Sequence, residues 1–577
     1  MPDLKPNLEA VVRYPKLMLS LAVAITMAAV PAAAAKQENR RAKTVDVQLL
    51  ALNDFHGNLE PPTGGGGRIT PPGGAPIDAG GAEYLATHIR RLEARNPNTL
   101  VVSAGDLIGA SPLLSALFHD EPTIEAMNSL GLDLNAVGNH EFDEGADELR
   151  RMQDGGCHPV DGCQDGDPFV GAEFDFLAAN VFNPAGGLRA GPSREQTILP
   201  PYAIRNFGGE KVAFIGMTLE DTPSIVSPSG IAGYDFRDEA DTANALVPEL
   251  RRRGAETIVV LLHEGGVPTG SYNDCPGISG PIVDIVNRTS DEVDLFVTGH
   301  THQAYNCVID GRTVTSASSA GRLVTDIDMT IDRRSGEPSR IRANNLIVTR
   351  DIARDAGQTA LIDKYRTLAA PIANRVIGTI TSDITRAATP AGESALGDVI
   401  ADAQLAATSA TGDAVAAFMN PGGIRADLTY AQGGGEGDGN VTYSEAFTVQ
   451  PFGNSLVTMT LTGAQIERML EQQWAGQPFP RILQVSAGFS YRWNPVAPVG
   501  ERVDPASITI GGVTVDPLAS YRITVNSFLA DGGDNFTVLR EGTDRLGGDV
   551  DIDALEKHFR ASSPLAPGAR DRITQGP

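Results

Sequence analysis

The sequence predicts an α/β fold, and three observations support this prediction. Short runs rich in Val, Leu and Ile alternate with helical segments from Val45 to about Ile347, as expected for buried strands and helices packed in layers. Five of these runs lead into a motif that carries histidine or carboxylate side chains. A further set of helical and strand-like segments follows Pro371, so the 577 residues should form more than one core.

The five strand runs of the first half are 47–52, 99–102, 134–137, 258–262 and 295–297. The motifs after them are Asn53-Asp54-Phe55-His56, Gly105-Asp106, Gly138-Asn139-His140-Glu141, His263-Glu264 and Gly299-His300-Thr301-His302. In open α/β sheets, binding sites form in the loops beyond the carboxyl ends of the strands. We therefore expect the motifs to converge at one sheet edge, although they are far apart in the sequence.

Helical patterns and further strand runs divide the chain into domains. Helices are expected at 82–94, 123–130, 242–253, 355–370, 396–408 and 464–474, and later strands at 376–381, 456–461 and 521–525. The expected division is a first domain at 44–350, a linker helix within 351–375 and a second α/β or α+β domain at 376–577. The Gly- and Pro-rich stretch 60–81 is expected to be a surface loop without regular structure.

The composition restricts the class of partner. Hydrophobic residues make up 41% and charged residues 20% of the chain, which is typical of a folded protein. The formal net charge of -26 argues against binding to a nucleic-acid polymer. A small anionic substrate stays compatible with it, because metal ions and a few arginines can reverse the potential within a cleft.

The N-terminus predicts export. An apolar run from Leu17 to Val30 follows Arg13 and Lys16 and precedes four alanines, a pattern typical of a signal peptide, here 1–35. The alternative, an uncleaved anchor, needs roughly 20 apolar residues, and this run is shorter. We therefore expect a periplasmic or extracellular protein that makes no membrane contact after cleavage.

The chain has four cysteines, an even number that suits an oxidising compartment and allows three pairings. We favour Cys157 with Cys163, which closes a small loop, and Cys275 with Cys307, which tethers a loop after the His263 motif to the strand after His302. A zinc knuckle is the weaker alternative, because neither pair has the C-x-x-C spacing.

The motif side chains are the types that bind divalent cations. Asp54 and His56 stand two residues apart where a strand opens into a loop, and a carboxylate such as Asp106 can bridge two ions. Any single histidine after a strand is more often structural, and Asp106 alone could be a helix N-cap. Five of the nine histidines lie in these motifs, and the joint pattern favours a two-metal phosphoesterase centre. The other four, which we expect to be dispensable, are His88, His119, His158 and His558.

The chain resembles the calcineurin-like metallophosphoesterase superfamily and, within it, the exported bacterial 5′-nucleotidase and UDP-sugar hydrolase family, since all five motifs occur in the family's order. The resemblance implies a four-layer metallophosphoesterase sandwich followed by a smaller α/β C-terminal nucleotide-binding domain. It also implies two divalent ions, of zinc, manganese, magnesium or cobalt. One site would take Asp54, His56, Asp106 and His302, the other would take Asp106, Asn139, His263 and His300, and His140 with Asp143 would form a catalytic dyad.

Turn-rich segments of the second half resemble the family's nucleotide-binding domain. They are Asn420-Pro421-Gly422-Gly423-Ile424-Arg425, Pro451-Phe452-Gly453-Asn454 and Phe528-Leu529-Ala530-Asp531-Gly532-Gly533-Asp534. By this likeness, Phe452 and Phe528 would enclose a base, Asp534 would meet the ribose, and Asn420 and Arg425 would hold the substrate and its phosphate. The structural alternative for both phenylalanines is core packing. Several relatives carry an arginine just before Glu393-Ser394-Ala395-Leu396-Gly397, where this chain has Gly392.

The leading hypothesis is a hydrolase that removes the 5′-phosphate of nucleotides by attack of metal-activated water. Alternatives with related chemistry are a 2′,3′-cyclic-nucleotide phosphodiesterase with 3′-nucleotidase activity and a nucleotide-sugar pyrophosphatase. A remote alternative is a surface protein that binds nucleosides without catalysis.

Overall fold

The computed structural model describes residues 43–62, 67–183, 196–226 and 230–576. The expected signal peptide, 1–35, lies outside these residues. None of the described helices combines the length and the apolar character that crossing a membrane requires.

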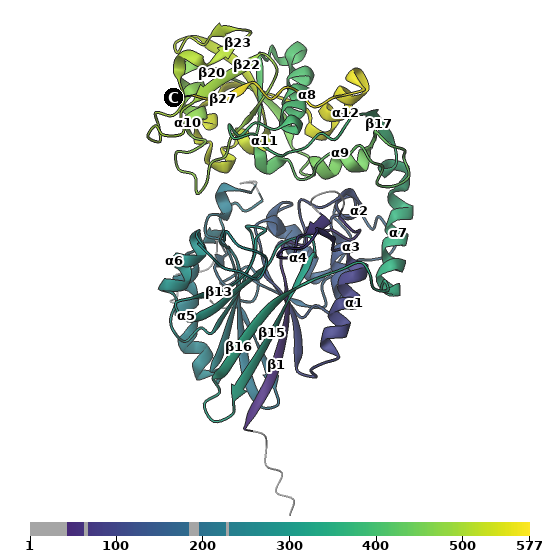
Figure 1. Cartoon of the computed structure of the whole chain (residues 1–577), viewed down its shortest axis with the longest axis vertical. Coiled ribbons are helices and arrows are strands. Elements are labelled where there is room, and N and C mark those ends of the chain that lie inside the picture. The colour runs from purple at the N-terminus through teal and green to yellow at the C-terminus, as the bar shows by residue number, and fades with distance from the viewer. Residues whose placement is uncertain (1–42, 63–66, 184–195, 227–229, 577) are drawn as a thin grey trace, which may run out of the picture. The chain divides into compact units, whose positions relative to one another are not determined.

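Two six-stranded sheets form the first part of the described chain (Figure 1). The first has the order β16-β15-β1-β4-β5-β6, with bounds Pro338–Ile347, Leu323–Asp332, Thr44–Leu52, Thr99–Ser103, Leu134–Ala136 and Asp175–Leu177. The second has the order β13-β14-β12-β11-β9-β8, with bounds Ala304–Ile309, Arg312–Ala317, Leu295–Thr298, Thr257–His263, Glu210–Thr218 and Tyr202–Phe207. Strands β1, β4, β5 and β6 are parallel in one sheet, and β9, β11, β12 and β14 are parallel in the other.

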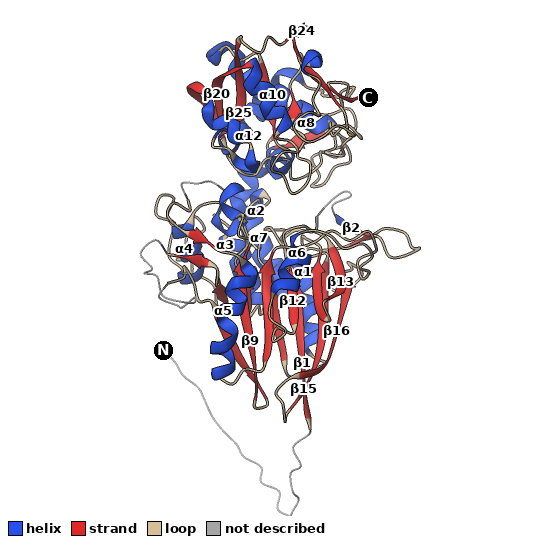
Figure 2. Cartoon of the chain, turned by 90° about the vertical axis from the view of Figure 1, so that its left-hand side faces the viewer, coloured by secondary structure: helices blue, strands red, loops and turns tan. Residues whose placement is uncertain are grey.

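Side chains along β1 point alternately to the two faces of the first sheet, and this alternation shows how the sheets and helices are layered. Leu49 and Ala51 pack in one core with Leu261 of β11, so this core lies between the two sheets. Leu50 and Leu52 point to the opposite face and pack against helices. The first sheet is covered by α1 (Ala82–Glu93), α3 (Glu121–Leu130) and α4 (Ala146–Asp154), and the second by α5 (Glu239–Arg252) and α6 (Pro281–Arg288). Figure 2 shows α5 beside the strands. The α/β class and the four-layer arrangement are confirmed.

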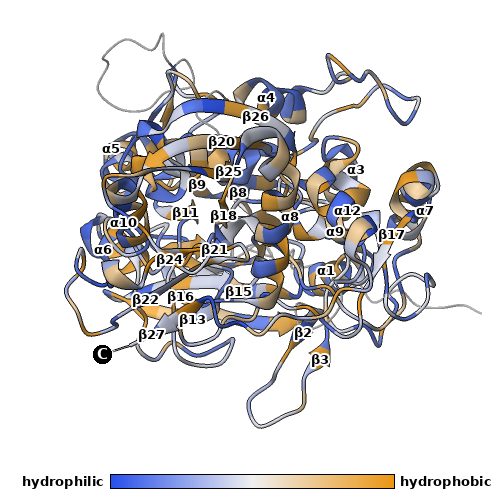
Figure 3. Cartoon of the chain, turned by 90° about the horizontal axis from the view of Figure 1, so that it is seen from above, coloured by the Kyte–Doolittle hydropathy of each residue, from blue (hydrophilic) through white to orange (hydrophobic). Residues whose placement is uncertain are grey.

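The later part of the chain holds smaller sheets of its own. A five-stranded sheet has the order β21-β18-β25-β20-β26, with bounds Gln484–Val485, Ala416–Met419, Ser520–Asn526, Ser455–Thr462 and Thr543–Val550. A four-stranded sheet has the order β24-β23-β22-β27, with bounds Val513–Thr514, Thr509–Ile510, Phe489–Trp493 and Ile573–Gln575. The longer helices are α8 (Ala395–Gly412), α10 (Gly463–Glu471) and α12 (Asp551–Ser562). Figure 3 shows hydrophobic and hydrophilic residues mixed along α8 and α10. Helix α10 buries one face, as expected for an amphipathic helix, whereas the first two turns of α8 are buried all round.

Four further α-helices and three two-stranded sheets lie in the described residues. The remaining helices are α2 (Leu113–Ala116), α7 (Ala356–Ala373), α9 (Tyr443–Val449) and α11 (Ser527–Ala530). Two-stranded sheets pair β2 (Arg68–Ile69) with β3 (Ile77–Asp78), β7 (Val181–Phe182) with β10 (Asp235–Phe236), and β17 (Val376–Thr379) with β19 (Asn440–Thr442). Helix α7 falls within the expected linker 351–375, and the domain boundaries themselves stay predictions.

The predicted elements agree with the structure apart from local details. Helix α5 begins three residues before the predicted start at 242, because the Asp238 side chain caps it by accepting from the Asp241 N–H at 2.8 Å. Helix α7 continues past Pro371 to Ala373, whereas a helix ending at 370 was predicted. The expectation of no regular structure in 60–81 is wrong, because β2 and β3 pair there.

Both expected disulfides are present. Cys157 is bonded to Cys163, and Cys275 is bonded to Cys307. The second bond connects the loop after β11 to strand β13, so it ties together two segments that follow predicted metal ligands. The zinc-knuckle alternative is therefore wrong for these four cysteines.

Candidate metal centre

The predicted ligands come from the carboxyl ends of strands in both large sheets. Asp54, Asp106 and Asn139 follow β1, β4 and β5 of the first sheet. His263 is the last residue of β11 in the second sheet, and His300 follows the adjacent strand β12. Since the two sheets pack face to face, their loops meet at one end of the interface between them. The predicted convergence at a sheet edge therefore involves two sheets.

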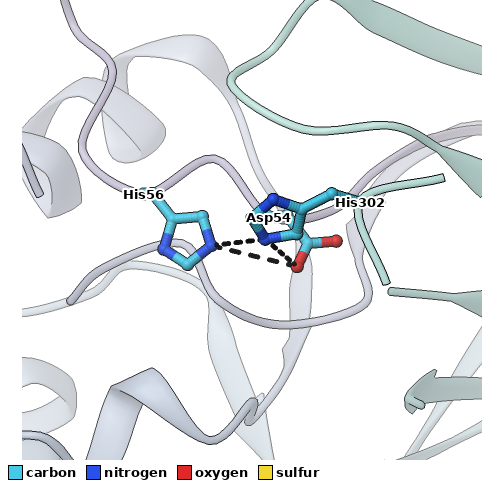
Figure 4. A group of neighbouring side chains, drawn as sticks. All are labelled: Asp54, His56 and His302. Atoms are coloured by element: carbon cyan, nitrogen blue, oxygen red, sulfur yellow. Dashed lines mark hydrogen bonds and ion pairs between the residues drawn. The ribbon is translucent and has the colours of Figure 1, made fainter. Parts of the chain in front are cut away.

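Asp54, His56 and His302 form one group (Figure 4). His56 Nε2 lies 3.1 Å from His302 Nε2 and 3.9 Å from Asp54 Oδ1, and His302 Nε2 lies 3.4 Å from the same carboxylate oxygen. The other ring nitrogen of His56, Nδ1, is 2.9 Å from the carbonyl oxygen of Gly109. That contact orients the ring so that Nε2 faces the group, as is common for metal-binding histidines.

Asp106, His263 and His300 form a second, adjacent group. His263 Nε2 lies 2.9 Å from Asp106 Oδ2, while His263 Nδ1 lies 2.7 Å from the carbonyl oxygen of Ala104. Asn139 Oδ1 is 3.0 Å from His300 Nδ1. Asp106 Oδ2 is also 3.7 Å from His56 Nε2 of the first group, so this carboxylate lies between the two groups.

The loops that carry the ligands have an unusual backbone. The non-glycine residues with positive φ include Asp54 (50°), His56 (47°), Asp106 (51°), His300 (68°) and His302 (54°). Left-handed conformations cost free energy for such residues and concentrate at functional sites. These residues stand two apart in the chain, at 54 and 56 and again at 300 and 302, where each loop carries two of the predicted ligands.

Two glycines of the motifs allow the loops to approach closely. Gly105 has φ of +91°, and a Cβ atom there would lie 2.7 Å from His263 Nδ1. A Cβ atom at Gly138 would collide with the Asp106 carboxylate. The glycine before each of these ligands therefore makes room for the neighbouring ligand.

Glu141 supports the centre in a way that the sequence did not reveal. Its buried carboxylate accepts hydrogen bonds from the backbone N–H groups of Asp106, Leu107 and Gly138, at 3.0, 2.9 and 2.7 Å. It thus joins the loop after β4 to the loop after β5. Glu141 belongs to the motif Gly138-Asn139-His140-Glu141, so the sequence did point to this region. The spacing of residues in a motif, however, does not distinguish a metal ligand from a residue that positions ligands.

Asn53 plays a comparable part beside Asp54. Its Nδ2 donates to Asp54 Oδ2 at 2.5 Å and to the carbonyl oxygen of Ser318 at 2.6 Å, and its Oδ1 accepts from the Ala317 N–H at 2.7 Å. These bonds fix the first ligand loop against the end of β14.

Burial controls the protonation of the cluster. It raises the pKa of Asp54 to about 7 and that of Glu141 to about 7, and it lowers the pKa of His56 and of His300 to about 3. Burial alone would also lower the pKa of His263, but the Asp106 carboxylate beside it raises that pKa to about 10. Few of these buried carboxyl and imidazole groups can therefore carry a charge unless an opposite charge lies beside them.

The donor set fits divalent cations. Asp106 Oδ2 and His263 Nε2 are buried and have no hydrogen-bond partner among the described residues, although they face each other at 2.9 Å. Two imidazole nitrogens, those of His56 and His302, likewise point at one another. Unpaired buried nitrogen and oxygen atoms that converge are expected where a cation replaces the missing partners.

His140 and Asp143 lie beside the ligands. His140 Nδ1 is 2.8 Å from Asp143 Oδ2, and the His140 backbone N–H donates to Asp106 Oδ1 at 2.9 Å. Burial would lower the pKa of His140, but the Asp143 and Asp106 carboxylates outweigh it and raise that pKa. A cavity of about 100 Å³, lined also by Gly109 and Phe452, opens beside the dyad.

Two of the predicted substrate residues, Phe452 and Arg425, lie near His140, and the other three, Asn420, Asp534 and Phe528, lie near the core of the later sheets. Phe452 stacks on His140, with ring centroids 5.7 Å apart and an interplanar angle of 19°, and the Arg425 guanidinium lies 5.9 Å from the Phe452 ring. Asn420 Nδ2 donates to Asp534 Oδ2 at 2.8 Å. Phe528 is half-buried beside Gly533 and the core of the later sheets. In the described part of the chain, the stacking partner of Phe452 is thus His140, and the enclosure of a base by two phenylalanines stays a prediction.

Comparison with known proteins places the chain in a family. Residues 47–304 match the calcineurin-like phosphoesterases, and residues 376–541 match the 5′-nucleotidase C-terminal domain. The chain is 30% identical, over 93% of its length, to the endonuclease YhcR of Bacillus subtilis, and 33% identical, over 87%, to the cell wall protein Lmo0130 of Listeria monocytogenes. It spans 42% of the first relative and 65% of the second.

A solved structure resembles the whole described fold. The 5′-nucleotidase precursor from Thermus thermophilus superimposes with a TM-score of 0.73 and 28% identity, over 92% of this chain and 99% of that one. The two family matches occur in the same order as the two sets of sheets. The chain therefore belongs to the calcineurin-like phosphoesterases that carry a 5′-nucleotidase C-terminal domain.

Proposed function

We propose that the protein is an exported phosphohydrolase that binds two divalent metal ions and removes the 5′-phosphate from nucleotides. The observation that carries this proposal is the pair of adjacent ligand groups, which share the Asp106 carboxylate between them. Asp54, His56, Asp106 and His302 would hold one ion. Asp106, Asn139, His263 and His300 would hold the other.

The ions, when bound, would lower the pKa of a water molecule and neutralise charge on the phosphoryl group. The protein supplies the rest of the chemistry. Glu141 and Asn53 fix the ligand loops through backbone hydrogen bonds, so little reorganisation is needed during the reaction. Asp54, His56, Asp106, Asn139 and His263 are buried, whereas His302 is partly exposed, so this side of the site is open to substrate and water.

His140 would act on the reacting phosphate. Its Nδ1 is held by Asp143, which leaves Nε2 to donate to a phosphoryl oxygen or to the departing ribose oxygen. The carboxylates around it favour the protonated ring, the form that can donate. Arg425, which lies near the Phe452 ring beside the dyad, would add a second positive charge for the phosphate.

The C-terminal residues would select nucleotides over simple phosphate esters. Phe452 and Phe528 would stack on the base, and Asp534 would accept hydrogen bonds from the ribose hydroxyls. Phe452 would have to exchange its stack on His140 for a stack on the base. The presence of a 5′-nucleotidase C-terminal domain supports this assignment.

The first experiment is an assay of the metal-reconstituted mature protein against AMP, UDP-glucose, 2′,3′-cyclic AMP and bis-p-nitrophenyl phosphate. We expect AMP to be hydrolysed with the highest kcat/KM. Turnover of diesters alone would instead identify a phosphodiesterase, and preference for UDP-glucose would identify a nucleotide-sugar pyrophosphatase. Absence of all turnover in protein with confirmed bound metal would favour a protein that binds nucleosides without catalysis.

Replacing His140, the predicted proton donor, tests the role of the His140–Asp143 dyad. We expect His140→Ala to lower kcat for AMP by about 10²–10⁴-fold, the usual contribution of a positioned proton donor, with unchanged metal content by elemental analysis. Asp143→Asn should give a smaller loss in the same direction. His558→Ala is the matched control, because that histidine lies on α12, away from the ligand groups, and should keep full activity. A wild-type kcat in the His140→Ala enzyme would contradict the role of the dyad.

Removing the aromatic rings tests base recognition. Stacking on an aromatic side chain contributes about 1–3 kcal/mol per base, so Phe452→Ala and Phe528→Ala should each raise KM for AMP by about 5–150-fold. KM for p-nitrophenyl phosphate, which has no nucleobase, should change little. Equal increases for both substrates would show that the rings act on the phosphate site instead.

A further inference from the structure

Asp120 carries a buried carboxylate that does not cap the helix beside it. The residue is 7% exposed and directly precedes α3, yet its side chain makes no capping hydrogen bond to that helix. An aspartate at this position usually accepts from the first free N–H groups of the helix. Asp120 Oδ2 instead accepts from the backbone N–H of Gly109 at 3.0 Å, 11 residues earlier in the chain. The carboxylate therefore supports the loop after β4 and not the helix.

The backbone at Asp120 has the left-handed conformation that favours glycine. Its φ is +60°, and the preceding residue, His119, has a φ of +51°. Such angles cost free energy for residues that carry a side chain, and they concentrate at functional sites. A glycine at this position would remove the cost, but it would also remove the carboxylate. The strain thus marks a position where the side chain contributes more than a relaxed backbone would.

Gly109 connects Asp120 to the first ligand group. The Gly109 carbonyl oxygen lies 2.9 Å from His56 Nδ1, and this contact turns the opposite ring nitrogen toward the other ligands of the group. Gly109 has a φ of +77°, and a Cβ atom there would lie 2.4 Å from the carbonyl oxygen of His140, so a side chain has no room. Glycine has the widest backbone freedom of any residue. The hydrogen bond from its N–H to Asp120 therefore restricts how the Gly109 carbonyl oxygen can turn.

Two buried carboxylates hold the loop from Asp106 to Gly109 at its two ends. Glu141 accepts from the backbone N–H groups of Asp106 and Leu107, at 3.0 and 2.9 Å. Asp120 accepts from the N–H of Gly109. Contacts outside the ligand shell orient metal-binding histidines, and their loss weakens metal binding by about 10–100-fold. Asp120 therefore does for the Gly109 end of the loop what Glu141 does for the Asp106 end.

Building on the proposed function, we propose that Asp120 is a positioning residue for the metal site that contains His56. Its carboxylate holds the Gly109 backbone, the Gly109 carbonyl oxygen holds His56 Nδ1, and His56 Nε2 is thereby aimed at the ion. In this role Asp120 acts through Gly109 and not on the ion directly. The competing account is that Asp120 only stabilises the fold around α3.

Calorimetric titration of the metal-free protein with manganese tests the proposal. The variants are Asp120→Ala, Asp120→Gly and Asp120→Asn. Asparagine keeps an oxygen that can accept from the Gly109 N–H, whereas glycine loses the side chain but suits the left-handed backbone. Asp133→Asn is the matched control, because Asp133 also accepts from a backbone N–H, that of Val101 at 2.8 Å, but lies at the start of β5, away from the ligand loops. Melting temperatures of the metal-free variants report on the fold.

We expect Asp120→Ala and Asp120→Gly to raise the manganese Kd at one of the two sites by about 10–100-fold and to leave the other Kd within about 2-fold of the wild type. In crystals grown at limiting manganese, the anomalous peak beside His56 should weaken while the peak beside His263 stays. Asp120→Asn should recover most of the affinity, and Asp133→Asn should match the wild type. Asp120→Gly should melt no lower than Asp120→Ala, because glycine relieves the left-handed backbone.

Unchanged manganese affinity at both sites in folded Asp120→Ala would overturn the proposal. So would equal weakening of both sites together with a lower melting temperature in every Asp120 variant, since that pattern assigns Asp120 to the stability of the fold. If the wild-type protein hydrolyses no nucleotide, the proposed function fails, and the manganese titration still decides the role of Asp120.

Discussion

The structure depends on one electrostatic constraint: carboxylates and imidazoles from the ends of two sheets are packed together in a largely buried cluster. Burial pushes the pKa of Asp54 up and those of His56 and His300 down, so the bare cluster resists carrying the charges that its residues bear in water. Divalent cations relieve this conflict, because they stabilise the ionised carboxylates and bind the neutral imidazoles. Positive φ angles at Asp54, His56, Asp106, His300 and His302 are a further cost that a folded chain tolerates where a bound ion offsets it.

The surrounding fold supports this cluster from several directions. The parallel strands β1, β4 and β5 end at the same edge of one sheet, and β11 and β12 end at the corresponding edge of the other. Glu141 then joins two of the ligand loops through backbone N–H groups, and the bond from Cys275 to Cys307 ties down the segments after β11 and β12. Such supports fix the separations of the predicted ligands.

Hydrophobic runs were sufficient to predict the strands that precede the five motifs and half of the α-helices of the described residues. The runs at 47–52 and 258–262 became β1 and β11, and the apolar periodicity at 82–94 became α1, because burial decides these segments locally. The sequence also predicted which Asp and His side chains lie together, because such residues after successive buried strands meet at the same end of a sheet. The sequence did not reveal the roles of Glu141 and Asn53, since their partners are backbone groups distant in the chain, nor the stack of Phe452 on His140. Contacts of this kind depend on tertiary packing, which spacing in one sequence does not encode.

We propose that the shared carboxylate of Asp106 lies between two cations. Anomalous diffraction from crystals grown with manganese tests this arrangement most directly. We expect two anomalous peaks about 3.5–4 Å apart, one beside Asp54, His56 and His302, the other beside Asn139, His263 and His300, with Asp106 contacting both. A single peak, or manganese bound elsewhere while these side chains keep their present contacts, would contradict it.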